Sequence, residues 1–407
     1  MKVKRILAGV IAAVMLLMTG SPVLAETAEA VEQVVATVNS SDSDFVIDEN
    51  GVLIKYLGTD NSVVIPDRVT SIGEWAFLGC TNLMRVVIPD NVASIGTGAF
   101  SGCIHLDNVV IPDSVTNIEE MAFSNCSNLK NIDIPDYVNR IGWEAFASCT
   151  SLESISIPNG ITTIENAAFC DCSGLTSIVI PDHVTNIEAY AFSGCSNLSD
   201  ILIPDSVINI DVGAFQDTNW FYSQPEGIVY AGKVAYGYKT SNRDQMISII
   251  LDDGTLGIAG GFLSSYDKLE SIQIPSSVIT MGNGAFESCS NLAKAIILSD
   301  SMNFGNSAFA DCPNLIIYAH TDSTAETYAN KNSIPFALIP DIIFGDLTGD
   351  GKADISDLMM LAQAVNGRTS LTAEQSAAAD VTGDGKADIA DLMKLAQFVN
   401  GKIDTLD

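Results

Sequence analysis

The sequence predicts an α+β protein, in which a curved, β-rich solenoid of about ten 23-residue turns precedes a small all-α domain. Two repeats carry this prediction. The pairs Ile-Pro and Ala-Phe each recur at a fixed spacing, Ile-Pro at 65, 88, 111, 134, 157, 180 and 203 and Ala-Phe at 76, 99, 122, 145, 168, 191 and 214. A fixed period in the twenties is typical of a solenoid, whose turns bury their apolar faces against one another. Two near-identical segments at the carboxyl end, 346–367 and 380–401, predict a separate domain.

Composition narrows the classes of function. The 407 residues include 19 basic and 50 acidic side chains, so there is no basic stripe to meet the phosphates of a nucleic acid. The hydrophobic fraction of 47% excludes a mainly disordered chain. Sequence motifs of serine hydrolases, zinc proteases and P-loop nucleotide-binding proteins are missing, and the sequence predicts a non-catalytic protein.

The segment 1–25 has the pattern of an export signal. Lys2, Lys4 and Arg5 precede a short apolar run, and a small-residue cleavage site ends at Ala25. The run is too short for a membrane anchor, and no later stretch is long and apolar enough to span a bilayer. We therefore expect a secreted protein without a transmembrane span, in which residues 26–44 form a flexible lead.

The regular repeats begin after an amino-terminal cap. Residues 45–59 predict a strand, a turn and a strand that close the amino-terminal end of the stack. In each following turn a short strand runs into Ile-Pro, a second apolar leg follows, and Ala-Phe closes the turn. Eight of the nine cysteines follow Ala-Phe by three residues, so they form one column of the repeat. We expect these thiols to be small buried groups rather than disulfides, and Cys170 has no assigned role.

The frame L-x-x-I-x-IP-x-x-V-x-x-I-x-x-x-AF-x-x-C resembles the leucine-rich repeats of the BspA-like, Treponema-type class. The resemblance extends over about residues 45–340 and implies a leucine-rich-repeat solenoid with a parallel sheet on one face. Regularity lapses at about 216–261, where the segment from Gly227 to Tyr238 predicts a hairpin projecting from the stack. A short helix and a final strand at about 316–339 predict the carboxyl-terminal cap.

The two carboxyl-terminal segments, which begin at Asp346 and Asp380, are identical at 18 of 22 positions. Each predicts a calcium loop followed by an amphipathic helix, because oxygen ligands recur at loop positions 1, 3, 5, 7, 9 and 12 with glycine at position 6. In the first loop the predicted ligands are Asp346, Thr348, Asp350, the Lys352 carbonyl, Asp354 and Asp357. In the second they are Asp380, Thr382, Asp384, the Lys386 carbonyl, Asp388 and Asp391. We expect two calcium ions. The predicted apolar faces are Ile355, Leu358, Leu361 and Val365, and Ile389, Leu392, Leu395 and Val399.

The doubled unit resembles a type I dockerin over about residues 345–404. The resemblance implies a calcium-dependent plug for a cohesin module of a scaffoldin, in the cellulosomes that anaerobic bacteria use to degrade plant polysaccharides. It also implies that loop positions 10 and 11 contact the cohesin. These positions are Ile355 and Ser356 in the first copy, and Ile389 and Ala390 in the second. Many dockerins carry a Ser-Thr pair there, which this chain lacks.

Three functions are compatible with these features. The first is a non-catalytic cellulosomal subunit, located extracellularly on a scaffoldin, whose solenoid recognises an unknown protein or glycan. The second is a polysaccharide-degrading enzyme with an unrecognised site, since dockerins often accompany hydrolases. The third is a free adhesin with a calcium-stabilised tail. Within the solenoid, the strand face and the aromatic residues between Trp220 and Tyr238 are both candidate recognition surfaces, although packing of the hairpin onto the stack is the favoured interpretation of the aromatic residues.

Overall fold

The computed structural model describes residues 41–406 except 243, 340–343, 351 and 404. The predicted export signal at 1–25 and most of the predicted lead lie outside the described residues. The end of that lead forms a 3₁₀ helix, η1 (Asp42–Asp44), which Ser41 caps at its amino end. The cap hairpin follows as β1 (Phe45–Ile47) and β2 (Val52–Tyr56), which pair in antiparallel fashion.

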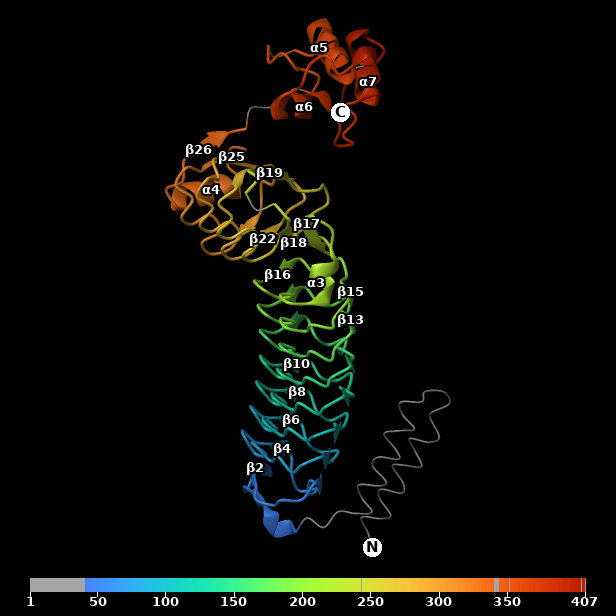
Figure 1. The fold of residues 1–407 in the computed structure, drawn as a ribbon, viewed down its shortest axis with the longest axis vertical. Coiled ribbons are helices and arrows are strands. Elements are labelled where there is room, and N and C mark those ends of the chain that lie inside the picture. The colour runs from blue at the N-terminus through green and yellow to red at the C-terminus, as the bar shows by residue number, and fades with distance from the viewer. Residues whose placement is uncertain (1–40, 243, 340–343, 351, 404, 407) are drawn as a thin grey trace.

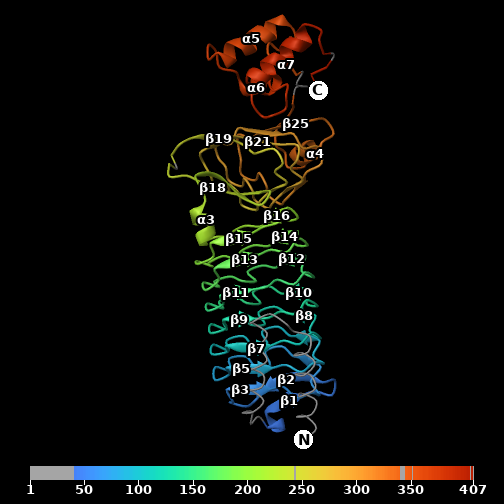
Figure 2. The ribbon, with the colours of Figure 1, turned by 90° about the vertical axis from the view of Figure 1, so that its right-hand side faces the viewer.

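The repeats stack into a column of turns with strands along two sides (Figures 1 and 2). The first ladder runs through the strand that precedes Ile-Pro: β3 (Ser62–Val64), β5 (Arg85–Val87), β7 (Asn108–Val110), β9 (Asn131–Ile132), β11 (Ser154–Ile155), β13 (Ser177–Val179) and β15 (Asp200–Leu202). The second ladder consists of two-residue strands in the next leg: β4 (Ser71–Ile72), β6 (Ser94–Ile95), β8 (Asn117–Ile118), β10 (Arg140–Ile141), β12 (Thr163–Ile164), β14 (Asn186–Ile187) and β16 (Asn209–Ile210).

This arrangement confirms the predicted solenoid and extends it. Strands of successive turns pair in parallel within each sheet, and paired residues are counterparts in the repeat, for example Val86 with Val109 and Ile72 with Ile95. The pairing is interrupted between β7 and β9, between β11 and β13, and between β10 and β12. The expected sheet on one face is therefore joined by a second ladder, because the leg after Ile-Pro is also extended. The stack has about 12 turns rather than ten, since the caps and the irregular segment contribute turns of their own.

Stacked phenylalanines fill the interior on the side of the Ala-Phe turns. From Phe77 to Phe215 each ring lies 4.8–5.7 Å from the next, with interplanar angles of 3–14°. Backbone hydrogen bonds join successive turns at the same place, because the N–H of each phenylalanine from Phe77 to Phe192 donates to the alanine carbonyl of the following turn. Phe100 N–H, for instance, donates to the Ala122 carbonyl at 2.8 Å. The strict period of the repeat keeps these rings in one column.

The cysteine column contains free thiols, as predicted, and is buried except at Cys80 and Cys312, which are half-buried. All nine cysteines are free thiols. Within the column the Sγ–H of Cys149 donates to the Phe123 carbonyl at 3.2 Å, and the same contact recurs from Cys103 to Cys195. Burial raises the pKa of the Cys149 thiol to about 12, so it remains protonated and unreactive at neutral pH.

The irregular segment 216–261 is built into the stack rather than projecting from it, which corrects the prediction. The helix α3 (Asn219–Ser223) precedes the predicted antiparallel hairpin of β17 (Gly227–Ala231) and β18 (Val234–Lys239). The strand β18 then pairs in parallel with β20 (Gly257–Ile258) and is largely buried. Both hairpin strands contribute apolar side chains to the core, and this burial holds the hairpin in the wall of the solenoid.

Beyond the hairpin the two ladders resume in new sheets. The first continues as β19 (Ile247–Ile250), β21 (Leu269–Ile274), β23 (Lys294–Ile297), β25 (Ile316–Ala319) and β26 (Phe336–Leu338), and the second as β22 (Thr280–Met281) and β24 (Asn303–Phe304) after β20. Figure 1 shows these turns swinging to one side of the lower column. The predicted cap helix is present as α4 (Thr324–Lys331), with Ser323 as its amino-terminal cap.

The carboxyl-terminal domain contains the two predicted helices, α5 (Ile355–Val365) and α7 (Ile389–Val399), which pack against each other. A third helix between them, α6 (Ala373–Ala379), was not predicted. Its signal is the capping box formed by Thr372 and Gln375. Across the described residues, the helices lack the length and apolar character needed to cross a bilayer.

Candidate functional site

The candidate site is the pair of acidic loops that lead into α5 and α7. Each helix begins with the same capping box. Asp354 accepts a hydrogen bond from the Ser356 N–H at 2.7 Å, and Asp357 accepts one from the Asp354 N–H at 2.8 Å. Asp388 and Asp391 repeat these contacts at the start of α7. The last two predicted ligand positions of each loop therefore also fix the amino end of its helix.

The carboxylate at loop position 12 is buried in both copies. Asp357 and Asp391 are 0% exposed. The second oxygen of each reaches back to the start of its loop, where it accepts the N–H of Thr348 at 2.8 Å or of Thr382 at 2.9 Å. A buried carboxylate is costly unless hydrogen bonds or a cation compensate its charge. These two residues thus tie the ends of their loops together around a negative charge.

The aspartate at the start of each loop accepts hydrogen bonds from backbone N–H groups of the same loop. Asp346 accepts the N–H groups of Gly349 and Asp350. Asp380 accepts those of Gly383 and Asp384, at 2.8 and 3.1 Å. This wraps each loop around its carboxylates, so that several oxygens face a common centre.

In the second loop the carboxylate oxygens of Asp380, Asp384 and Asp391 lie within 4.8 Å of one another. Hard oxygen ligands at this spacing fit a calcium ion, which would neutralise their mutual repulsion. In the first loop Gly351 lies outside the described residues, and no such triad is found among the residues described there. The Thr382 hydroxyl donates to Asp391, one of these three residues, at 2.8 Å.

The first residue of each helix points to solvent. Ile355 is 63% exposed and Ile389 is 64% exposed, which corrects the prediction that they belong to the buried faces of the helices. The buried face centres instead on Leu361 and Leu395. Helical periodicity explains the difference, since Asp357 occupies the buried face two residues after Ile355.

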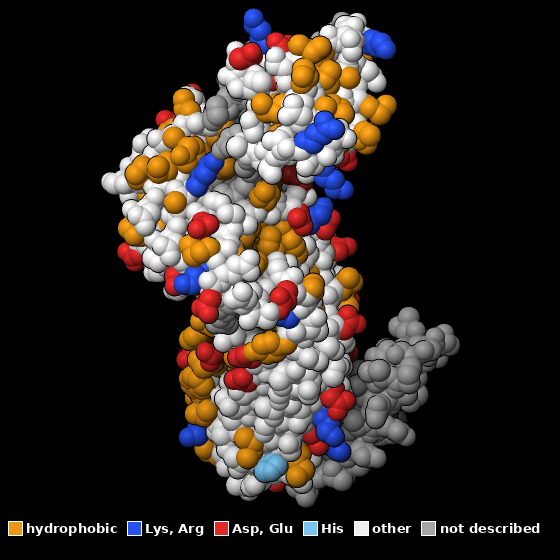
Figure 3. Space-filling model, turned by 45° about the horizontal axis from the view of Figure 1, so that its top comes forward, with side chains coloured by type: hydrophobic (Ala, Val, Ile, Leu, Met, Phe, Trp, Pro, Cys, Tyr) orange, Lys and Arg blue, Asp and Glu red, His pale blue; other side chains and the backbone are white. Residues whose placement is uncertain are grey.

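Two exposed methionines were missed by the sequence analysis. Met359 is 59% exposed and Met393 is 61% exposed, and each follows the exposed isoleucine of its helix by four residues. The i, i+4 spacing places both side chains on one face, and it is the signal that would have revealed them. Ser356 and Ala390 are also exposed. Figure 3 shows hydrophobic side chains gathered over this end of the molecule.

Comparison with known families identifies both parts of the chain. Residues 57–176, 130–224, 162–242 and 225–333 match the BspA type leucine rich repeat region. The chain belongs to the BspA-type leucine-rich repeat family. Residues 344–400 match the dockerin type I domain. Type I dockerins generally bind calcium, and together the two matches indicate a cellulosome-type module with a role in protein interaction.

Solved structures similar to the chain are bacterial leucine-rich repeat proteins. The T. pallidum protein is 32% identical, with 43% of this chain and 85% of that chain covered, and a TM-score of 0.40. The Bacteroides ovatus protein is 25% identical, with 74% and 97% covered and a TM-score of 0.37. A leucine-rich cell surface protein from Faecalibacterium prausnitzii is 25% identical, with 72% and 97% covered and a TM-score of 0.38. Comparison with curated proteins gave no match.

The two halves of the dockerin domain differ beside their helices. A hollow of about 410 Å³ lies next to α5, lined by Met360 of that helix, by Gln375 of α6 and by residues 369–371 between them. At the position equivalent to Met360, the second half carries Lys394, whose Nζ donates to the Val381 carbonyl at 2.6 Å. The near-identical loops are thus set in different surroundings.

The aromatic cluster of the BspA-type repeats serves mainly to pack the hairpin. Trp220 and Tyr236 are 9% and 8% exposed, and the Tyr236 ring meets Phe215 edge to face at 5.4 Å. The Tyr236 hydroxyl also accepts the Phe215 N–H at 2.8 Å. Tyr222, in contrast, is 61% exposed. Of the two interpretations left open by the sequence, packing therefore holds for the buried members of the cluster.

Proposed function

We propose that the chain is a non-catalytic subunit of a cellulosome. In this proposal its dockerin domain binds a scaffoldin cohesin when two calcium ions occupy the loops, and its solenoid recognises a protein or glycan. The protein would be secreted through residues 1–25 and would act in the breakdown of plant polysaccharides. The observation that carries the proposal is the doubled loop–helix unit, in which a buried aspartate closes each acidic loop beside an exposed isoleucine and methionine.

Calcium and docking are linked through the start of each helix. The same aspartates that would ligate calcium cap α5 and α7, directly beside Ile355 and Ile389. Without the cation, the clustered carboxylates repel one another and the loop loses order. The exposed isoleucine and methionine then lose the fixed geometry that a cohesin surface requires. The predicted ligands are the twelve loop residues named above, and the contact residues are Ile355, Ser356, Ile389 and Ala390.

The repeated face makes two docking orientations available. A single change at Ile355 or Ile389 leaves the other helix intact, and we expect it to weaken cohesin binding by only about twofold. The double variant Ile355→Ser/Ile389→Ser removes an apolar anchor from both orientations. We expect a loss of about 30-fold or more, because central apolar anchors contribute roughly 2 kcal/mol or more.

The experiment is a calcium-dependent binding measurement on the full chain. Immobilised cohesins from scaffoldins of the source organism are titrated with the chain in calcium and then in chelator. Tyr137→Ala is the matched control, since Tyr137 is 68% exposed but lies on the solenoid. We expect calcium-dependent binding that the double variant abolishes and the control retains. Failure to bind any of the cohesins would favour a free adhesin, and release of sugars from plant polysaccharides by the purified chain would favour an enzyme.

A further inference from the structure

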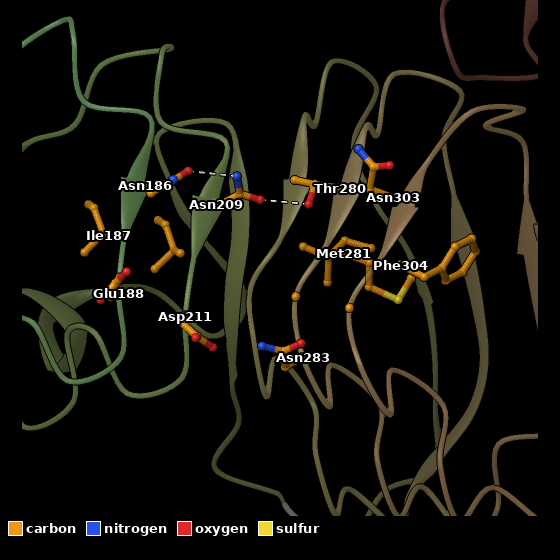
Figure 4. Close-up of a pocket in the computed structure, with 14 residues that line it drawn as sticks. Asn186, Ile187, Glu188, Asn209, Asp211, Thr280, Met281, Asn283, Asn303 and Phe304 are labelled. Carbon is orange, nitrogen blue, oxygen red and sulfur yellow. Dashed lines mark hydrogen bonds between the residues drawn. The ribbon is translucent and has the colours of Figure 1, made fainter. Parts of the chain in front are cut away.

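The second ladder has a seam where the irregular segment joins the stack. The sheet that ends at β16 and the sheet that contains β20, β22 and β24 are separate, although β16 and β20 are neighbours. The Gly260 N–H donates to the Ile210 carbonyl at 2.9 Å and holds the two sheets together. A cleft of about 310 Å³, shown in Figure 4, is lined by residues from both sheets at this junction. This volume lies at the lower end of the range for ligand pockets, roughly 300–1,000 Å³.

One wall of the cleft carries hydrogen-bonding side chains in a row that crosses the seam. The side-chain amide of Asn209 donates to the Asn186 Oδ1 at 2.9 Å, and the Thr280 hydroxyl donates to the Asn209 Oδ1 at 2.7 Å (Figure 4). Asn303 occupies the next position of the same column and also lines the cleft. Each amide offers a donor and an acceptor side by side, which matches two adjacent hydroxyl groups of a sugar.

The opposite side of the cleft carries carboxylates on one sheet and glycines on the other. Glu188 and Asp211 project from the turns that contain β14 and β16, whereas glycines 282 and 305 occupy the equivalent positions after β22 and β24. The floor includes Ile258 and Met281. The cleft therefore combines carboxylate acceptors, amides and an apolar base, and the glycines lie where the backbone of the preceding turn approaches closely.

A second hollow of about 240 Å³ begins at the next residue along the seam. Its lining includes Val212, Phe221, Tyr222 and Tyr238. The Gly261 N–H donates to the Asn283 carbonyl at 2.9 Å, which connects the wall of this hollow to that of the first. Aromatic rings with an exposed face can stack against the apolar face of a sugar ring. The two hollows thus place ring surfaces beside hydrogen-bonding groups.

The charges of the lining residues and the pairing of the strands along the cleft indicate which class of ligand fits it. The residues that line the two hollows include no lysine, arginine or histidine, so an anionic ligand would meet uncompensated carboxylates. On the second ladder Arg140 lies two turns before Asn186, and it is paired with Glu119, Glu120 and Glu165. The edge strand β16 pairs with β14 and lies against β20, which itself pairs with β18 and β22, and this arrangement disfavours a peptide bound by strand addition.

We infer that this cleft is a binding site for a neutral oligosaccharide. The amides and carboxylates bind its hydroxyl groups, and the neighbouring aromatic hollow receives an adjoining ring. The inference deepens the recognition half of the proposed function and is independent of the docking half, because none of the lining residues belongs to the dockerin domain.

The test uses the full chain in isothermal titration calorimetry with cellohexaose, xylohexaose, mannohexaose and the anionic hexamer of galacturonic acid. We expect at least one neutral hexamer to bind with a Kd of about 1 mM or tighter. Asn303→Ala and Asp211→Asn should each weaken binding about tenfold, the effect of losing a hydrogen bond to a polar or charged group. Asn117→Ala is the matched control, since Asn117 occupies the same column outside the cleft and should leave the Kd unchanged.

Three outcomes would overturn the inference. These are no binding of any neutral hexamer, tighter binding of the anionic hexamer, and binding that the cleft variants leave unchanged. Circular dichroism checks that each variant is folded, and Asp211→Asn preserves shape where an alanine would not. Cohesin binding is measured on the same samples, so that a failure of sugar binding with docking intact is distinguishable from a failure of docking.

Discussion

The phenylalanine column allows a quantitative test of how the solenoid is held together. Phe146 lies at its centre and is 0% exposed, with ring centroids 5.4 Å from Phe123 and 5.7 Å from Phe169. Phe146→Ala removes a buried ring together with two stacking contacts. Burial of phenylalanine contributes about 3–5 kcal/mol to the free energy of unfolding, and each aromatic pair adds roughly 0.5–1.5 kcal/mol. We therefore expect a loss at the upper end, about 4–5 kcal/mol.

The variant should also change how the stack unfolds. Each turn contacts only its neighbours, so a weak central turn uncouples the turns before it from those after it. In a urea titration followed by circular dichroism, we expect the single transition of the solenoid to separate into two. Phe146→Leu is the control, with an expected loss of about 1–2 kcal/mol because most of the volume is retained. A loss below about 2 kcal/mol for Phe146→Ala, or equal losses for the two variants, would refute the reasoning.

Three further predictions follow from individual contacts. In Asp391→Asn, an amide that is partly a donor replaces a buried carboxylate that accepts backbone N–H groups. The free energy of unfolding of the dockerin domain should fall by about 3 kcal/mol, and its melting temperature, measured by circular dichroism, should fall by roughly 10–20 °C even in chelator. Burial raises the pKa of Cys149 to about 12, so the thiol releases its proton on unfolding above about pH 9. The free energy of unfolding from urea titrations should therefore fall between about pH 9 and pH 12, and a flat profile would contradict this. Ser148 has a φ of 59°, at a position where other turns carry glycine, so Ser148→Gly should stabilise the fold by about 0.5–1 kcal/mol in the same titration.

The fold could be predicted from the sequence wherever each turn repeats its neighbour. The fixed step of the repeat predicts the parallel register, the buried phenylalanine column and the free thiols, because every turn faces the same surroundings. The caps were also predictable, since their signals are local: a turn between two short strands, and Ser323 ahead of α4. The two-residue strands of the second ladder were not predicted, because they are too short for a period of two to show.

Tertiary packing decided the features that the sequence left open. The hairpin of β17 and β18 was visible as a hairpin, but its place in the wall depends on the partner β20, which lies about one turn later. In the dockerin domain the loop spacing predicts the ligand residues, and the triad of Asp380, Asp384 and Asp391 supports three of them. The outward direction of Ile355 depends on where α5 begins, a boundary that Asp354 sets through its cap.

The same reasoning explains why a ligand site should lie at the seam. In the regular part of the solenoid each turn has the same shape as the next, and equivalent side chains stack on one another. The hairpin breaks this continuity, because β18 starts a new sheet and leaves β16 beside β20 without a regular ladder. The cleft opens there, between side chains as far apart in sequence as Asn209 and Thr280. A departure from the period removes the constraint of matching the next turn, and these side chains are then available to bind a ligand.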